Sequence, residues 1–181
     1  MNRMFFRSMK VWIAATVLVV LVLAGTAIGV HVTSSTSFCL SCHEMRVHQQ
    51  ELALSPHAQD ARGNAIECVQ CHIPSTNIVR MLSAKTWLGT KDLWVHATTG
   101  GSVTLNRREI QPEARRFMDD ANCRACHEDL YRNAKNDGAI SEYGRLAHDN
   151  YLDKNGSSRS GCAGCHRNIA HLPPEDRHYD A

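Results

Sequence analysis

Aromatic side chains and a strong net charge are both scarce in this chain of 181 residues. Phe, Trp and Tyr together make up 6% of it, which is little for a packed core of this length. The formal net charge is +2, and no basic patch is interleaved with aromatic residues, so we expect no nucleic-acid partner. No nucleophile motif of the usual hydrolase kinds occurs, which disfavours a hydrolase.

Cysteine and histidine are instead abundant, with eight and eleven copies. All eight cysteines fall into four copies of the pattern C-x-x-C-H, which are Cys39-Leu40-Ser41-Cys42-His43, Cys68-Val69-Gln70-Cys71-His72, Cys123-Arg124-Ala125-Cys126-His127 and Cys162-Ala163-Gly164-Cys165-His166. In this attachment motif of c-type haem, two thioether bonds hold the porphyrin edge and the adjacent histidine reaches the iron. We therefore predict four covalently bound haem c groups, with the motif histidines as iron ligands.

Zinc sites and disulfides also use closely spaced cysteines. A zinc site does not need a histidine directly after every second cysteine, and disulfides inside such short loops would be strained. Haem also accounts for the scarce aromatic residues, because four apolar macrocycles can replace the missing core. A chain wrapped around haems is expected to be mainly α, with helices, loops and little sheet.

The N-terminal region predicts a membrane anchor. Residues 11–30 (VWIAATVLVVLVLAGTAIGV) carry no charge and are long enough, as a helix, to cross the roughly 30 Å hydrocarbon core. A cleaved signal peptide has a shorter apolar region, of about 7–15 residues. Arg3, Arg7 and Lys10 precede the segment and no acidic residue occurs before Glu44, which places the N-terminus in the cytoplasm. We expect residues 1–32 to form the N-terminus and a single-pass anchor in the bacterial inner membrane, and residues 33–181 to form a periplasmic tetrahaem domain.

Several helices are predicted outside the anchor. The uneven spacing of the motifs suggests two haem pairs with a longer connector between them. We expect helices over residues 45–55 and 76–97, and weaker ones over 111–121 and 141–152. In the second of these, an apolar stripe is formed by Ile78, Met81, Leu82, Leu88 and Trp94. The tail, residues 172–181, is expected to be a surface extension.

Seven histidines outside the motifs, and one methionine, are candidates for the remaining iron positions. His57 lies between the first two motifs and His148 between the last two, so both can reach another haem. Met45 follows His43 by two residues and either replaces it on the iron or packs on the porphyrin.

Lys85 and Asp92 are seven residues apart and share one face of the predicted helix. Beside a haem near the membrane, they could bind a quinol hydroxyl and accept its proton. From the spacing alone, a solvated charged face is the more common explanation.

Taken together, the motifs resemble the NapC/NirT family of membrane-anchored multihaem quinol dehydrogenases. Within that family, the type they resemble most is the membrane small subunit of cytochrome c nitrite reductase. The resemblance covers nearly the whole chain. Its most specific parts are the C-x-x-C-H-E-M stretch at 39–45 and the closing Ile169-Ala170-His171; it also includes Ser55-Pro56-His57, Lys91-Asp92 and Ala147-His148-Asp149.

The resemblance implies roles for the candidate ligands. Met45 would be the proximal ligand of haem 1, with Asp92 on the distal side and Lys85 at the quinol pocket. His57 would ligate haem 4 opposite His166, and His148 would ligate haem 3 opposite His127. Haem 2 would have His72 on one side, and on the other either a lysine from a partner subunit or His96.

The function implied is oxidation of menaquinol or ubiquinol from the inner-membrane quinol pool, with electrons passed to a periplasmic reductase. Cytochrome c nitrite reductase, acting in nitrite ammonification, is the favoured partner, and a periplasmic nitrate reductase is the alternative. A tethered electron carrier without a quinol site, with all irons bis-histidine, stays open. A terminal reductase with an open haem is disfavoured, because the small chain leaves few residues for a substrate cavity.

Overall fold

The described residues of the chain form helices and loops. The structure is a computed structural model, and it describes residues 2–101, 107–133, 137–153, 161–167 and 169–171. Within these ranges β structure is limited to two isolated bridges, Gln59–Ala65 and Arg132–Ala139. The helices are α1 Asn2–Val32, α2 Thr36–Cys39, a 3-10 turn His43–Met45, α3 Arg46–Ala53, α4 Cys68–His72, α5 Ile78–Thr99, α6 Arg107–Phe117, α7 Asp120–Arg124, α8 Glu142–Asp153 and α9 Gly161–Cys165. The predicted mainly α class is confirmed.

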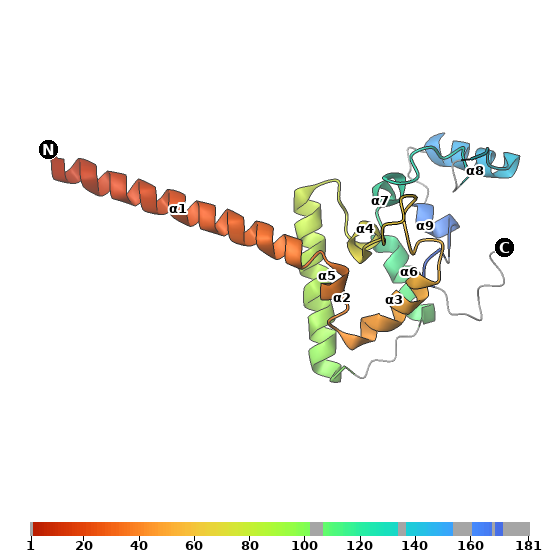
Figure 1. The fold of residues 1–181 in the computed structure, drawn as a ribbon, viewed down its shortest axis with the longest axis horizontal. Helices are drawn as coiled ribbons and strands as arrows, with labels where there is room; N and C mark the ends of the chain where they lie inside the picture. Colours follow the sequence, from red (N-terminus) through yellow and green to blue (C-terminus); the bar gives the residue numbers. More distant parts are fainter. Residues whose placement is uncertain (1, 102–106, 134–136, 154–160, 168, 172–181) are drawn as a thin grey trace.

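Helix α1 extends away from the rest of the chain as a single rod (Figure 1). Its segment Met9–Val32 has a mean hydropathy of 2.6 and is long enough to cross a bilayer. Large apolar side chains are exposed along its length, including Leu18 and Leu23. A helical segment that is apolar all round and whose side chains are left uncovered suits a lipid environment, in agreement with the predicted anchor.

Helix α5 crosses the end of α1 and lies between α1 and most of the remaining helices (Figure 1). Asn77 caps its start by accepting hydrogen bonds from the backbone N–H groups of Val79 and Arg80, at 2.8 and 3.2 Å. Gly100 ends it in the left-handed conformation, with φ of 61°. The helix, Ile78–Thr99, begins and ends two residues later than the predicted range 76–97.

The apolar stripe predicted on this helix is only partly correct. Met81, Leu82 and Leu88 are partly buried, but Ile78 and Trp94 are 62% and 70% exposed. The reason is that the described chain packs on only one side of α5, so hydrophobic residues at other positions around the helix stay uncovered.

The helices that carry the C-x-x-C-H motifs pack in sequence order, α2 on α4, α4 on α7 and α7 on α9. Thr36 joins the first two, since its N–H donates to the Glu67 carboxylate at 2.8 Å and its hydroxyl accepts from the N–H of Cys68 at 3.2 Å. The Asp120 carboxylate joins the last two by accepting from the N–H of Cys162 at 2.7 Å. The predicted motif pairs therefore lie together, and α4 and α7 connect them.

The other predicted helices agree with the structure, with one exception. The ranges 45–55 and 141–152 correspond to α3 and α8. The range 111–121 is instead divided between α6 and α7, because the Asp119 side chain accepts a hydrogen bond from the N–H of Ala121 and starts a new helix there. The predicted tail, 172–181, lies outside the described residues.

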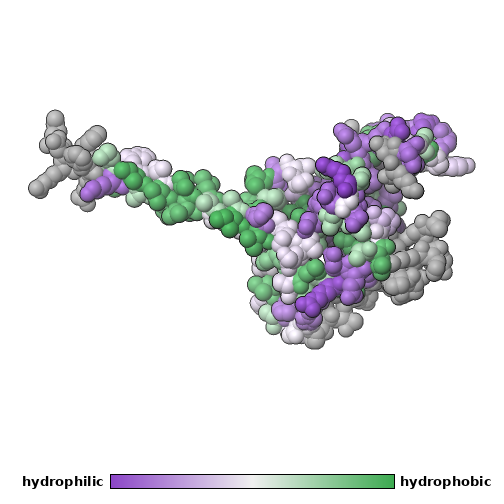
Figure 2. Space-filling view, viewed as in Figure 1, coloured by the Kyte–Doolittle hydropathy of each residue, from purple (hydrophilic) through white to green (hydrophobic). Residues whose placement is uncertain are grey.

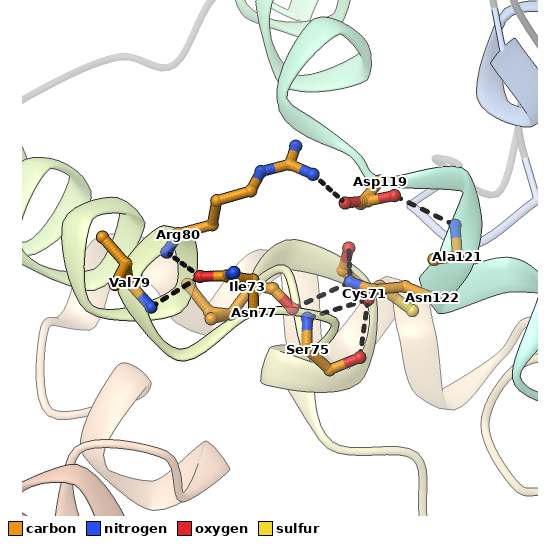
Figure 3. Close-up of polar contacts among 9 residues, drawn as sticks. All are labelled: Cys71, Ile73, Ser75, Asn77, Val79, Arg80, Asp119, Ala121 and Asn122. Atoms are coloured by element: carbon orange, nitrogen blue, oxygen red, sulfur yellow. Dashed lines mark hydrogen bonds and ion pairs between the residues drawn. The ribbon is translucent and has the colours of Figure 1, made fainter.

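A buried asparagine connects α7 to the segment after the second motif. Asn122 is 8% exposed. Its side-chain N–H groups donate to the carbonyls of Cys71 and Ile73, at 3.2 and 2.8 Å, and its carbonyl accepts from the Ser75 hydroxyl at 3.2 Å (Figure 3). One side chain thus satisfies polar groups that would otherwise be left unpaired where the two motif pairs meet.

Replacing Asn122 by alanine is expected to destabilise the haem-loaded protein by about 2–3 kcal/mol, because two backbone carbonyls lose their donors. Thermal unfolding followed by circular dichroism measures the effect. Asn77→Ala is the matched control, since it removes only an exposed helix cap worth about 1 kcal/mol. A loss for Asn122→Ala no larger than for the control would contradict the role assigned to this side chain.

Candidate haem-ligand and quinol site

Each motif histidine faces one histidine from outside the motifs. The ring centroids are 6.1 Å apart for His43–His96, 5.9 Å for His72–His171, 6.0 Å for His57–His127 and 6.0 Å for His148–His166. A metal–imidazole bond is about 2 Å long, so two imidazoles on opposite sides of one iron have centroids about 6 Å apart. The separations at the second, third and fourth motifs therefore each fit a haem iron between the two rings.

The outer histidines also show the hydrogen bond expected of metal ligands. In each, Nδ1–H donates to an oxygen, which leaves Nε2 as the lone-pair nitrogen. The acceptors are the Ile169 carbonyl for His57 at 3.1 Å, the Leu130 carbonyl for His148, the His48 carbonyl for His171 at 3.0 Å and the Glu44 carboxylate for His96 at 2.7 Å. The donor set thus fits haem in both spacing and tautomer.

His72 is held in the neutral form that binds a metal. Burial lowers its pKa to about 4, with smaller contributions from His171 and His48. It therefore stays uncharged well below neutral pH.

The pairs differ from those implied by the resemblance. His57 lies opposite His127 rather than His166, and His148 lies opposite His166 rather than His127. His96 lies beside the first motif, where its ring also contacts Glu44. The histidine facing His72 is His171. The sequence pointed to the closing Ile169-Ala170-His171 as part of the resemblance, but His171 was not predicted to be a haem ligand.

The first motif differs from the other three. The Nε2 of His43 donates to the Gly101 carbonyl at 2.9 Å, and its Nδ1 lies 3.6 Å from the Glu44 carboxylate. Among the described residues, no hydrogen bond occupies a ring nitrogen of His72, His127 or His166.

Gly101 permits the close approach to His43. Its φ is 73°, and a Cβ there would lie 2.7 Å from Cε1 of His43. The backbone after α5 thus accepts a hydrogen bond from the ring nitrogen of His43 that would otherwise face an iron. Met45, two residues on in the 3-10 turn, is partly buried and is the remaining candidate on that side.

The attachment cysteines of neighbouring motifs meet. The side chains of Cys39 and Cys68 share a hydrogen bond. Cys123 and Cys162 also share one. Haem edges attached at these sulfurs would lie close together in motifs one and two, and again in motifs three and four.

Lys85 ties α5 to the end of the anchor. Its Nζ donates to the Val30 carbonyl at 3.2 Å and to the Ser34 hydroxyl at 2.6 Å, and Cys39 of the first motif lies near enough to affect its pKa. Burial lowers the pKa of Lys85 below the ordinary value for lysine. Lys85 thus lies between the end of α1 and the first C-x-x-C-H motif.

Asp92 lies two helical turns further on, about 10 Å along the axis. Its carboxylate is 54% exposed and 3.7 Å from the Nζ of Lys91. Within the described ranges no hydrogen bond or ion pair joins Asp92 to Lys85. The structure thus places the two residues on one helix without bringing them into contact.

Comparison with known proteins identifies the family of this chain. Residues 1–176 match the family described as NapC/NirT cytochrome c family, N-terminal region. The chain is 29% identical over 153 residues to the tetraheme c-type cytochrome CymA of Shewanella oneidensis, covering 80% of both chains. It is 30% identical over 155 residues to the cytochrome c-type protein NapC of Escherichia coli K12, covering 82% of this chain and 74% of NapC. Longer cytochrome c-type relatives also match, and the chain spans 39% of their length.

A solved structure is similar as well. A chain of the cytochrome c nitrite reductase NrfHA complex bound to the HQNO inhibitor superposes with a TM-score of 0.52, at 26% identity, over 90% of both chains.

Proposed function

Because the chain belongs to the NapC/NirT cytochrome c family, we propose that it oxidises membrane quinol at the periplasmic surface of the inner membrane and passes the electrons to a periplasmic reductase. The observation that carries this proposal is the position of Lys85, between the end of the anchor and the first haem motif. A quinol from the bilayer would meet a proton-exchanging side chain and the first haem site at the same place.

The chain's own residues supply the haem sites. The eight motif cysteines hold the macrocycles, and the ligand pairs proposed for haems 2, 3 and 4 are His72 with His171, His127 with His57, and His166 with His148. When bound, the four haems supply irons that take up and release one electron at a time.

At haem 1 the proposed proximal ligand is Met45. The support is the hydrogen bond from Nε2 of His43 to Gly101, since a nitrogen that donates to a carbonyl does not at the same time ligate an iron. His96, held by Glu44, is the candidate on the other side.

Lys85 and Asp92 are proposed to handle the protons. Two acceptors fix the Lys85 ammonium, and its lowered pKa favours exchange of a proton with a quinol hydroxyl. Asp92, exposed to solvent two turns away, would pass a proton to the periplasmic water.

The acceptor is proposed to be a periplasmic reductase that docks reversibly. The similar chain in a nitrite reductase complex favours a cytochrome c nitrite reductase. His171 opposite His72 favours a dissociable complex, because an internal ligand at haem 2 leaves no position for a lysine from the partner. A nitrate reductase partner is compatible with the same internal ligand.

The test is anaerobic reduction of the haem-loaded full chain in liposomes that contain a menaquinol. We expect the haem absorption bands to change to the reduced form, and HQNO to slow the change. If dithionite reduces the haems but neither menaquinol nor ubiquinol does, the chain is a tethered carrier and the proposal fails.

A further inference from the structure

One face of α5 is exposed and uncharged. Val79, Trp87, Leu93 and Trp94 are 66%, 63%, 66% and 70% exposed, and they all lie on this side of the helix. Large apolar side chains this exposed along a single helix, in a domain with few aromatic residues, indicate a surface that another phase or molecule covers.

Helical geometry makes the face continuous. With about 100° between successive residues, the arc from Leu82 round to Trp87 spans about 140°. Every residue of α5 in this arc is uncharged. The charged residues of the helix, Arg80, Lys85, Lys91 and Asp92, all lie outside it. A shallow depression that is widely open to the outside is lined by Leu82, Ser83, Thr86, Trp87 and Thr90 on the same face.

The anchor determines what this face meets. α5 crosses the domain-side end of α1 at a steep angle (Figure 1), and the hydrogen bonds from Lys85 to Val30 and Ser34 tie the two helices together there. With α1 spanning the bilayer, α5 therefore runs roughly parallel to the membrane plane at the level where the anchor leaves it. Figure 2 shows hydrophobic surface continuing from α1 onto the adjoining edge of the domain.

We propose that α5 lies in the membrane interface, with this uncharged face in the outer leaflet of the bilayer that α1 spans. Tryptophan favours the headgroup region, and this face carries Trp87 and Trp94, whereas Arg80, Lys85, Lys91 and Asp92 all lie outside it. The occupant is lipid rather than a protein, because the face adjoins the membrane already crossed by α1. The helix then fixes the height and tilt of the haem domain relative to the bilayer.

Cysteine labelling of the haem-loaded full chain in liposomes tests the proposal. All eight native cysteines belong to haem motifs, so an introduced cysteine provides the reactive thiol. Thr90→Cys places it on the uncharged face, and Lys91→Cys, one residue on, places it about 100° away. Both native side chains are exposed in the structure of the chain. A charged, membrane-impermeant maleimide is expected to react at least about tenfold more slowly at Thr90→Cys, because lipid covers it.

An uncharged, lipid-soluble maleimide separates lipid from protein as the cover. It is expected to label both variants at similar rates. Equal labelling of the two variants by the charged reagent would overturn the proposal, since the face would then be open to water. Protection of Thr90→Cys from both reagents would also overturn it, since the cover would then be protein or a haem. Haem absorption spectra identical to those of the unmodified chain show that both variants are intact.

Discussion

Replacing Lys85 with leucine is expected to lower the rate of quinol oxidation by about 100-fold, which is the lower range of what a positioned acid or base contributes. The substitution leaves a shorter aliphatic side chain and removes the ammonium that donates to Val30 and Ser34. The measurement is stopped-flow reduction of the haems by menaquinol in liposomes. All four haems should remain bound, because Lys85 is not in an attachment motif.

The control is Lys91→Leu, which removes a lysine from the same helix. Lys91 is 53% exposed and lies 3.7 Å from the carboxylate of Asp92, so the rate should fall only slightly. Asp92→Asn should lower the rate as well, and Lys85→Leu combined with Asp92→Asn should cost less than the product of the single effects if the two act on one substrate. A normal quinol oxidation rate in Lys85→Leu, with haems intact, would remove the quinol site from this position.

The pH dependence follows from the pKa of Lys85. Burial lowers this pKa, so at a given pH more of the amine is neutral than in an exposed lysine. Only the neutral amine accepts a proton, and the rate of quinol oxidation should therefore rise with pH across this group's titration. Lys85→Leu should lose that rise, whereas Lys91→Leu should keep it.

Changing His171 to methionine is expected to raise the midpoint potential of one haem by on the order of 100 mV, because a thioether favours ferrous iron more than an imidazole does. The haem concerned is the second, since His171 faces His72 at 5.9 Å. His171→Leu should instead produce a high-spin signal by leaving one axial position without a protein ligand. Potentiometric titration with electron paramagnetic resonance measures both effects in the isolated full chain.

His57→Met is the companion variant for this experiment. His57 faces His127, so its replacement should shift a different haem from the one shifted by His171→Met. If a partner subunit supplied the second ligand of haem 2, neither His171 variant would change any potential or spin state in the isolated chain. That result would also restore a tightly bound partner in place of a dissociable one.

The haem number and the anchor could be predicted without the fold because their signals are local. Five consecutive residues define each attachment motif, and twenty consecutive uncharged residues define the anchor. The helix at 76–97 was also predictable, since Asn77 and Gly100 supply its start and end signals. Which face of that helix is covered could not be predicted, because the exposure of Ile78 and Trp94 depends on what packs against them.

The sequence by itself determined how many haems this protein holds, where they attach and that a membrane helix precedes them. Only the tertiary structure decided which histidines face each other. His57 is 112 residues from Ile169, whose carbonyl sets its tautomer, and His43 is 58 residues from Gly101, whose carbonyl occupies its Nε2. The packing of α5 and the motif helices brings these residues together. The spacing along the chain does not encode that packing, because a flexible connector of these lengths can bring any of the histidines to any motif.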